Sequence, residues 1–215
     1  MDTLQIAQGS ADWFKVRLGK VTASRVADVI AKTKTGYGAS RKNYMAELVA
    51  ERLTGAPTES YINAAMKWGT DTEPQARAAY EFFRDASVAE VGFVPHPKIV
   101  MSGASPDGLV GDDGLLELKC PSTATHIDTL LAKAIPDKYL VQMQWQMACA
   151  GRAWCDFASF DPRLPEDLRL FVKRVHRDEA RIGELEREIV AFLAELDAMI
   201  AALRPVRELT PLDAG

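Results

Sequence analysis

The stretch that decides the fold starts with Ser105-Pro106-Asp107-Gly108. Three residues after Gly108 it continues with Gly111-Asp112-Asp113-Gly114, which leads into Leu116-Glu117-Leu118-Lys119-Cys120. The segment Asp112-Asp113-Gly114 consists of residue types that form tight turns between antiparallel strands. The stretch therefore predicts a β-hairpin, with one strand starting after Asp107 and the other returning over residues 115–120.

The predicted hairpin brings Asp107 close to Glu117. Side chains two positions apart in a strand leave the same face, so Lys119 joins Glu117 while Leu116 and Leu118 point to the other face. Magnesium binds oxygen ligands and keeps waters that a substrate phosphate can replace, and a lysine can hold or activate the attacking water. An ordinary turn with a solvated Glu-Lys pair is the alternative, but the interleaved leucines favour a metal site.

The pattern resembles the Pro-Asp…(Asp/Glu)-x-Lys nuclease superfamily and, within it, the phage lambda exonuclease family. Further matches keep the order and near-identical spacing of that family from about residue 8 to the end of the chain. These are Trp13…Arg17-Leu18-Gly19, Thr22-Ala23-Ser24, Trp68-Gly69…Glu73, Tyr139…Gln142-Met143-Gln144 and Phe160-Asp161-Pro162-Arg163. The resemblance implies an α/β fold with a restriction-endonuclease-like core, in which helices flank a central mixed β-sheet.

The resemblance also implies roles for residues of the catalytic site. Lys119 would orient or activate water, and Gln142 matches a glutamine that touches this water or the scissile phosphate. Glu73 matches a water-mediated ligand of a second ion, but it also fits a carboxylate at a helix start. The implied ligands of two Mg²⁺ ions, with Mn²⁺ as a substitute, are Asp107, Glu117 and the backbone carbonyl of Leu118.

A second implied site holds the terminal 5′-phosphate of DNA. Its matching residues are Arg17, Thr22, Ser24 and Ser105. Arginine binds phosphate oxygens bidentately and hydroxyls complete the shell. Thr22 and Ser24 equally fit caps of the next helix, and the two interpretations are compatible because helix starts attract phosphate. Met66 aligns with an apolar wedge that parts the last base pairs, although it also fits a core position.

Charge is distributed unevenly along the 215 residues. The chain has a net charge of −4, but residues 1–55 carry nine Lys/Arg against five Asp/Glu, a balance of +4 that leaves −8 for the remainder. Phosphate binding depends on local potential rather than on net charge, so this segment is a candidate DNA surface, with a solvated basic face as the alternative. Its candidate residues are Lys15, Arg17, Lys20, Arg25, Lys32, Lys34, Arg41 and Lys42.

Composition indicates a soluble cytoplasmic protein. There is no apolar run of membrane-spanning length and no leader pattern. The three cysteines and the histidines His96, His126 and His176 have no metal-ligand spacing, and an odd cysteine count favours reduced thiols. We expect one domain over residues 1–215, with a helical phosphate-binding part over about 1–85, a nuclease core over about 86–176 and a helix over about 178–203.

Periodicity predicts the individual elements. Helices are expected after caps at Thr22 or Ser24 and at Ser40, over residues 62–84 with a kink or a new start at Pro74, and over 138–150. Strands are expected over 88–94, 99–102, 108–110, 115–120, 154–160 and 168–175. The helix over 178–203 carries an apolar stripe that either docks a partner or packs against the sheet of the chain itself.

The function implied by the resemblance is that of a 5′-to-3′ exodeoxyribonuclease. It would digest one strand of linear duplex DNA to 5′-mononucleotides and leave a 3′ single-stranded tail for annealing-type recombination. A ring-shaped homotrimer, a single-strand annealing partner protein and a phage or prophage origin are also implied. Two alternatives remain: an endonuclease or flap nuclease of the same superfamily, which does not need Arg17, and a non-catalytic module that binds DNA ends.

Overall fold

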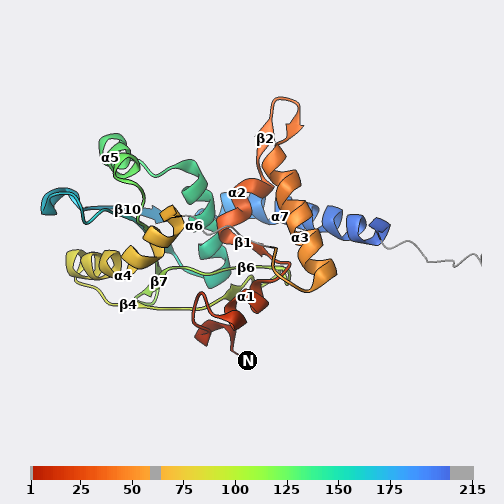
Figure 1. The fold of residues 1–215 in the computed structure, drawn as a ribbon, viewed down its shortest axis with the longest axis horizontal. Helices are drawn as coiled ribbons and strands as arrows, with labels where there is room; N and C mark the ends of the chain where they lie inside the picture. Colours follow the sequence, from red (N-terminus) through yellow and green to blue (C-terminus); the bar gives the residue numbers. More distant parts are fainter. Residues whose placement is uncertain (1, 59–63, 204–215) are drawn as a thin grey trace, which may run out of the picture.

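A mixed five-stranded sheet forms the centre of the computed structural model, which describes residues 2–58 and 64–203 (Figure 1). Its strand order is β10-β9-β8-β7-β4. The β8–β9 pair is parallel and the other neighbours are antiparallel, which confirms the predicted mixed sheet. The strands are β4 (Val88–Ala89), β7 (Gly108–Val110), β8 (Gly114–Lys119), β9 (Trp154–Phe160) and β10 (Leu170–His176).

A smaller sheet lies beside the central one and has the order β1-β6-β5, where β1 is Val21–Thr22, β5 is Val94–Pro95 and β6 is Ser102–Ala104. The prediction of one strand over residues 88–94 is wrong, because β4 and β5 belong to different sheets. Between them Gly92 N and Phe93 N donate to backbone carbonyls of the N-terminal segment instead of extending either strand. The expected strand over 99–102 lies two to three residues later, as β6.

Helices surround these sheets. The expected helices at 138–150 and 178–203 are present. The helix expected over 62–84 is present from residue 64 and runs through Pro74 without ending, while residues 62 and 63 lie outside the described residues. The short helices over residues 11–17 and 123–132 were not predicted. The α-helices are α1 (Ala11–Arg17), α2 (Val26–Val29), α3 (Ala39–Thr54), α4 (Ala64–Arg84), α5 (Thr123–Ala132), α6 (Asp137–Ala150) and α7 (Glu179–Leu203). Single turns of 3₁₀ helix are η1 (Thr3–Gln5), η2 (Ala23–Arg25) and η3 (Glu166–Leu168), and β2 (Lys32–Thr33) pairs with β3 (Gly36–Tyr37) in a hairpin.

The predicted helix caps near the N-terminus are wrong. Thr22 precedes η2 without a side-chain capping bond, and α2 follows Arg25 rather than a hydroxyl residue. Ser40 is the second residue of α3, whose N-cap is Gly38. The helix α3 ends at Gly55, which has φ +69° and whose N–H bonds to Glu51 O.

Two helices cover opposite faces of the central sheet. On one face Leu116 and Leu118 of β8 pack with Ala76 and Tyr80 of α4. On the other face Leu115 packs with residues of α6 and β9, namely Met143, Met147, Cys155 and Phe157. The alternation of β8 therefore points Glu117 and Lys119 toward α6, because they share the parity of Leu115.

The C-terminal helix α7 is held mainly by other helices. In Figure 1 it lies beside α2 and α3, on the side of the molecule away from α4. The apolar stripe expected from the sequence is buried in a cluster with residues of α2, α3 and α6, so it packs on helices of the chain itself and not on the central sheet or a partner. The stripe comprises Ile182, Leu185, Ile189, Phe192, Leu193 and Leu196, with Ile200 at its edge.

Cys120, Cys149 and Cys155 are free thiols. Across residues 2–58 and 64–203, no helix combines the length and the apolar character that crossing a membrane requires.

Candidate functional site

The hairpin of β7 and β8 positions the first candidate carboxylate. Gly108 pairs with Leu116, so Asp107 stands one residue beyond the end of the ladder, level with Glu117. Asp107 Oδ2 accepts a hydrogen bond of 2.6 Å from Leu118 N, which fixes the side chain against β8. The turn itself is shifted by one residue from the prediction. It contains Gly111, with φ +54°, and the two aspartates that follow, while Gly114 already pairs with Val110.

Glu117 is the buried centre of the site. Its carboxylate has no exposed surface. Oε1 accepts from Gln142 Nε2 at 2.6 Å and forms an ion pair with Lys119 Nζ. Oε2 accepts from Gln146 Nε2 at 2.5 Å. The structure therefore brings together Asp107, Glu117, Lys119 and Gln142, as the hairpin geometry and the resemblance predicted.

Burial and like charge control the protonation of Asp107. Burial, with the nearby charge of Glu117, raises the pKa of Asp107 to about 8, and the cation of Lys119 only partly offsets this. Burial opposes the charge on Lys119, but the carboxylates of Glu117 and Asp107 outweigh it and raise the pKa of the lysine. Lys119 is consequently a cation at neutral pH and donates hydrogen bonds.

The carboxylate pair fits a hard divalent cation. The carboxylates of Asp107 and Glu117 repel one another, and this repulsion adds to the effect of burial in raising the pKa of Asp107, although Lys119 lowers it. A divalent cation at this place would offset the excess negative charge. The N–H of Leu118 points to Asp107. In an extended strand the carbonyl of the same residue points to the same side, so Leu118 also offers an oxygen there.

The donor set is small. Within the described ranges, no three His, Cys, Asp or Glu residues gather as metal ligands. Two carboxylates with a backbone carbonyl suit Mg²⁺, which takes few protein ligands and retains water.

Glu73 lies near the pair without bonding to it. It is on α4, nine residues after Ala64, so its interpretation as a helix-start carboxylate is wrong. Its negative charge contributes to the raised pKa of Asp107. Glu73 Oε1 accepts a bond of 3.0 Å from Arg77, which also pairs with Glu90. The helix thus holds a third carboxylate close to the site.

A second cluster forms around Ser105, two residues before Asp107. Ser105 Oγ lies 2.9 Å from Arg17 Nη1 and 3.0 Å from Trp13 Nε1, and both nitrogens donate to it. The guanidinium of Arg17 stacks over the ring of Trp13, 3.9 Å from its centroid. Burial lowers the pKa of Arg17 to about 10. No carboxylate of the described residues forms an ion pair with Arg17, so its charge is available to an anion.

The other candidate phosphate ligands lie on the adjoining chain. β1 pairs in parallel with β6, with Thr22 opposite Gly103, and this places Thr22 beside the strand that leads into Ser105. Thr22 is buried and its N–H donates to Tyr44 Oη. Ser24 is exposed on η2. Neither side chain makes a capping hydrogen bond, so the predicted caps are absent.

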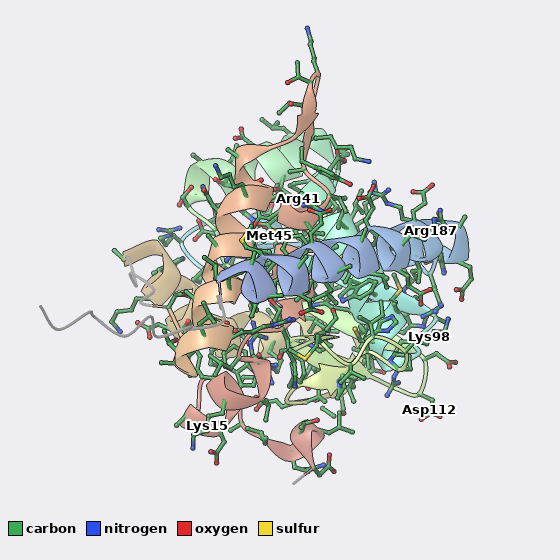
Figure 2. All side chains as sticks on the ribbon, turned by 90° about the vertical axis from the view of Figure 1, so that its right-hand side faces the viewer. Lys15, Arg41, Met45, Lys98, Asp112 and Arg187 are labelled. Atoms are coloured by element: carbon green, nitrogen blue, oxygen red, sulfur yellow. The ribbon has the colours of Figure 1, made fainter. Side chains whose placement is uncertain are left out.

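Half of the basic residues expected to form a surface near the N-terminus are neutralised by carboxylates. Arg25 pairs with Asp28 and Glu47, and Lys32 pairs with Glu188. Arg41 is 4% exposed and forms a bidentate pair with Glu195 of α7, against which α3 lies in Figure 2. Lys15 pairs with Asp12. Of the predicted cluster, Arg17, Lys20, Lys34 and Lys42 have no carboxylate partner within the described part of the chain.

Two further residues differ in how the sequence predicted them: Met66 was a candidate site residue and Gln146 was not. Met66 belongs to α4 by its backbone, but its side chain lies outside the described part of the structure. Gln146 was not predicted as a site residue. Its signal was the spacing of four from Gln142, which puts both amides on one face of a helix. Gln144, between them, faces away and bonds to His176 O.

Comparison with known proteins agrees with this geometry. A model of the YqaJ-like viral recombinase domain matches residues 12–153. Two crystal structures of an alkaline exonuclease, LHK-Exo from Laribacter hongkongensis, one of them in complex with dAMP, are 56% identical in sequence and cover 90% of this chain and 96% of theirs. Their TM-scores are 0.86 and 0.85.

A phage-related exonuclease from Haemophilus somnus 129PT shares the fold, with a TM-score of 0.71 at 18% identity over 86% of this chain and 96% of its own. The comparison with curated proteins gives no match. Since the family model covers well over half of the sequence, and the exonuclease relative nearly all of it, this chain belongs to the YqaJ-like viral recombinase family, the lambda exonuclease family that its motifs resemble.

Proposed function

We propose that the protein is a metal-dependent 5′-to-3′ exodeoxyribonuclease. It digests one strand of linear double-stranded DNA to 5′-mononucleotides and leaves a 3′ single-stranded tail for annealing-type recombination. The observation that carries this proposal is the convergence of Asp107 and Lys119, both partly exposed, on the buried carboxylate of Glu117. Two residues before Asp107, Ser105 is bonded to Arg17, which has no carboxylate partner among the described residues.

The catalytic roles follow from these contacts. Asp107, Glu117 and the carbonyl of Leu118 would hold Mg²⁺, and Glu73 would reach a second ion through water. Mg²⁺, or Mn²⁺ in its place, supplies Lewis acidity that polarises the phosphate and stabilises the leaving oxygen.

Lys119, as a cation, donates to the attacking water and orients it for attack on phosphorus. Gln142, which bonds to Glu117 and is only partly buried, can turn its amide to the same water or to the phosphate. Both residues act by positioning the reacting atoms, and such positioning supplies much of the rate enhancement in this kind of hydrolysis.

Recognition of the chain end is assigned to the Ser105 cluster. Arg17 and Ser105, with Thr22 and Ser24, would bind the terminal 5′-phosphate, because a partly buried guanidinium that has no carboxylate partner among the described residues favours an anion. Two residues of chain span at most roughly 7 Å. The separation of Ser105 from Asp107 therefore suits a site that cuts one nucleotide from the end. LHK-Exo, the exonuclease relative, is known in complex with dAMP, a mononucleotide of the class that this reaction releases.

The assembly and its setting are part of the same proposal. We infer a single exonuclease domain over residues 1–215, since LHK-Exo aligns with 90% of the chain. From the family resemblance we also propose a homotrimeric ring and an annealing protein as partner. The same resemblance suggests Met66 as a strand-separating wedge and action in the cytoplasm of a bacterial host.

Substrate ends provide the test. Linear duplex with a 5′-phosphate, the same duplex with a 5′-hydroxyl, and a covalently closed circle are incubated with the protein and Mg²⁺, and the products are separated by size. We expect mononucleotides from the phosphorylated end, slower release from the hydroxyl end and an intact circle. Nicking of the circle would instead identify an endonuclease, and binding of ends without hydrolysis in Mg²⁺ or Mn²⁺ would identify a non-catalytic module.

A further inference from the structure

Gln146 contacts the deepest part of the candidate metal site. Its side chain has no exposed surface, and its Nε2 lies 2.5 Å from Glu117 Oε2. One helical turn earlier, Gln142 donates to Oε1 of the same carboxylate. Because each amide holds a different oxygen, the pair fixes the plane of the Glu117 carboxylate.

The two glutamines are not equivalent. Gln142 is only partly buried and shares Oε1 with Lys119, so its bond is one of two and can be exchanged for a bond to substrate. Gln146 is fully enclosed, and its Nε2 is the one side-chain donor to Oε2 among the described residues. Substrate cannot reach it, and its bond can persist through the reaction.

A buried thiol lies against the oxygen end of the Gln146 amide. Cys155 Sγ is 3.9 Å from Gln146 Oε1 and equally far from Asp156 O, so its one proton can be donated to either oxygen. Because a carboxylate oxygen accepts hydrogen bonds, the NH₂ end of the amide faces Glu117 and Oε1 faces Cys155 of β9.

We propose that Gln146 is a positioning residue of the metal site. It holds the Glu117 carboxylate in one orientation through its bond to Oε2. This inference rests on the proposed metal-dependent function, and it concerns a residue that touches neither substrate nor metal. Partners that orient a metal ligand in this way raise metal affinity, and their loss lowers the affinity by about 10- to 100-fold.

Gln144 provides a matched control on the same helix. It is also buried, with 6% of its surface exposed. Its Nε2 donates to His176 O and its Oε1 accepts from Asp178 N, so it joins α6 to the chain between β10 and α7. Replacing Gln144 removes an equally buried amide of the same helix without touching Glu117.

The test measures Mn²⁺ binding to metal-free protein by electron paramagnetic resonance, without DNA and without turnover. We expect Gln146→Met to weaken Mn²⁺ binding by about 10- to 100-fold, and Gln144→Met to bind Mn²⁺ as the wild type does. Binding of duplex ends in the absence of divalent ions should be the same in both variants, because neither glutamine belongs to the phosphate cluster.

The melting temperature shows whether Gln146→Met folds. If it does not, a second variant takes its place in the test. Gln146→Asn keeps a polar amide but is one methylene shorter, so its N–H does not reach Oε2. We expect the same weakening of Mn²⁺ binding. Wild-type affinity in the folded Gln146 variants, or an equal loss in Gln144→Met, overturns the positioning role alone. A wild-type protein that binds no Mn²⁺ overturns the metal site and this inference together.

Discussion

Arg17 and Ser105 are joined by a hydrogen bond of 2.9 Å, although they are 88 positions apart in the sequence. The bond ties the end of α1 to the segment that carries Asp107, two residues further on. Any anion bound by Arg17 is therefore held at a fixed short distance from the carboxylate pair. In the proposed function, this relationship would link recognition of a chain end to the place of cleavage.

Replacing Arg17 should remove the preference for phosphorylated ends. Arg17→Ala loses a charged donor, and hydrogen bonds to charged groups contribute about 1.5–3 kcal/mol, so we expect the ratio of rates on 5′-phosphate and 5′-hydroxyl duplexes to fall by about 10- to 100-fold. Arg17→Lys should restore only part of this ratio, because lysine neither binds phosphate bidentately nor stacks on Trp13 as arginine does.

The control for Arg17 is Arg187→Ala, which removes an exposed arginine of α7 labelled in Figure 2. It should leave the ratio unchanged. Equal ratios for Arg17→Ala and wild type would remove Arg17 from end recognition.

Asp107→Ala should abolish hydrolysis and leave DNA binding measurable. The substitution removes a metal ligand and the acceptor of the Leu118 N–H, while the Arg17 and Ser105 contacts remain. Single-turnover digestion and a DNA-binding titration on the same preparation separate the two effects. Asp112→Ala, in the exposed hairpin turn, is the control and should digest at the wild-type rate. Normal digestion by Asp107→Ala would refute the site.

The pKa of Asp107 predicts a dependence of metal binding on pH. In the metal-free protein burial and Glu117 hold this pKa at about 8, against an ordinary value of 3.8. A cation must displace the proton below about pH 8, so apparent Mg²⁺ affinity should rise about tenfold per pH unit toward that value and then level off.

Stability of the metal-free protein should change in the opposite direction. Because the folded state holds this proton more tightly than the unfolded state, the contribution of Asp107 is full below pH 3.8 and is lost as pH rises through about 8. Calorimetric titration with Mg²⁺ in buffers of different ionisation enthalpy measures the protons released, and melting curves without metal measure the stability. Mg²⁺ affinity that is independent of pH would contradict the assignment.

Gly108 has no room for a side chain, which explains the glycine after Asp107. A Cβ at this position would lie 2.1 Å from Val88 Cγ1 across the β4–β7 pair. Overpacking of this kind costs about 1–3 kcal/mol, so Gly108→Ala should lower the free energy of unfolding by that amount in a denaturant titration.

Val88→Ala removes the clashing methyl group and should restore most of the stability when it is combined with Gly108→Ala. The interaction energy from the double-mutant cycle checks this. Additive effects of the two substitutions would show that the clash is not the cause.

Several elements could be predicted because their signals are local. The strands at 108–110 and 154–160 have the expected bounds, and α7 has the expected stripe. The errors occurred where partners distant in sequence compete with local propensity. Residues 91–93 left the expected strand because the N-terminal segment takes their backbone bonds. Ser40 has the chemistry of a cap, but α3 starts one residue before it.

The residues of the site also divide into those that local signals predict and those that long-range packing decides. Alternation along Leu115 to Lys119 was enough to place Glu117 and Lys119 on one face, since a strand has a period of two. Gln146 was overlooked because three glutamines on α6 look alike in sequence. Which of them meets Glu117 depends on how the helix is rotated over β8 and β9, and packing of Met143 and Met147 against Leu115 sets that rotation.

By itself the sequence determined the hairpin, the family and the identity of the two carboxylates and the lysine, because turn residues and strand alternation act over a few neighbouring positions. Tertiary structure alone decided which charges remain available to DNA. Arg41 and Arg17 both belong to the basic segment of residues 1–55, yet Arg41 is neutralised by Glu195, 154 positions away, whereas Arg17 has no carboxylate partner in the described chain. Such pairing follows from the packing of α3 against α7, and no local pattern encodes it.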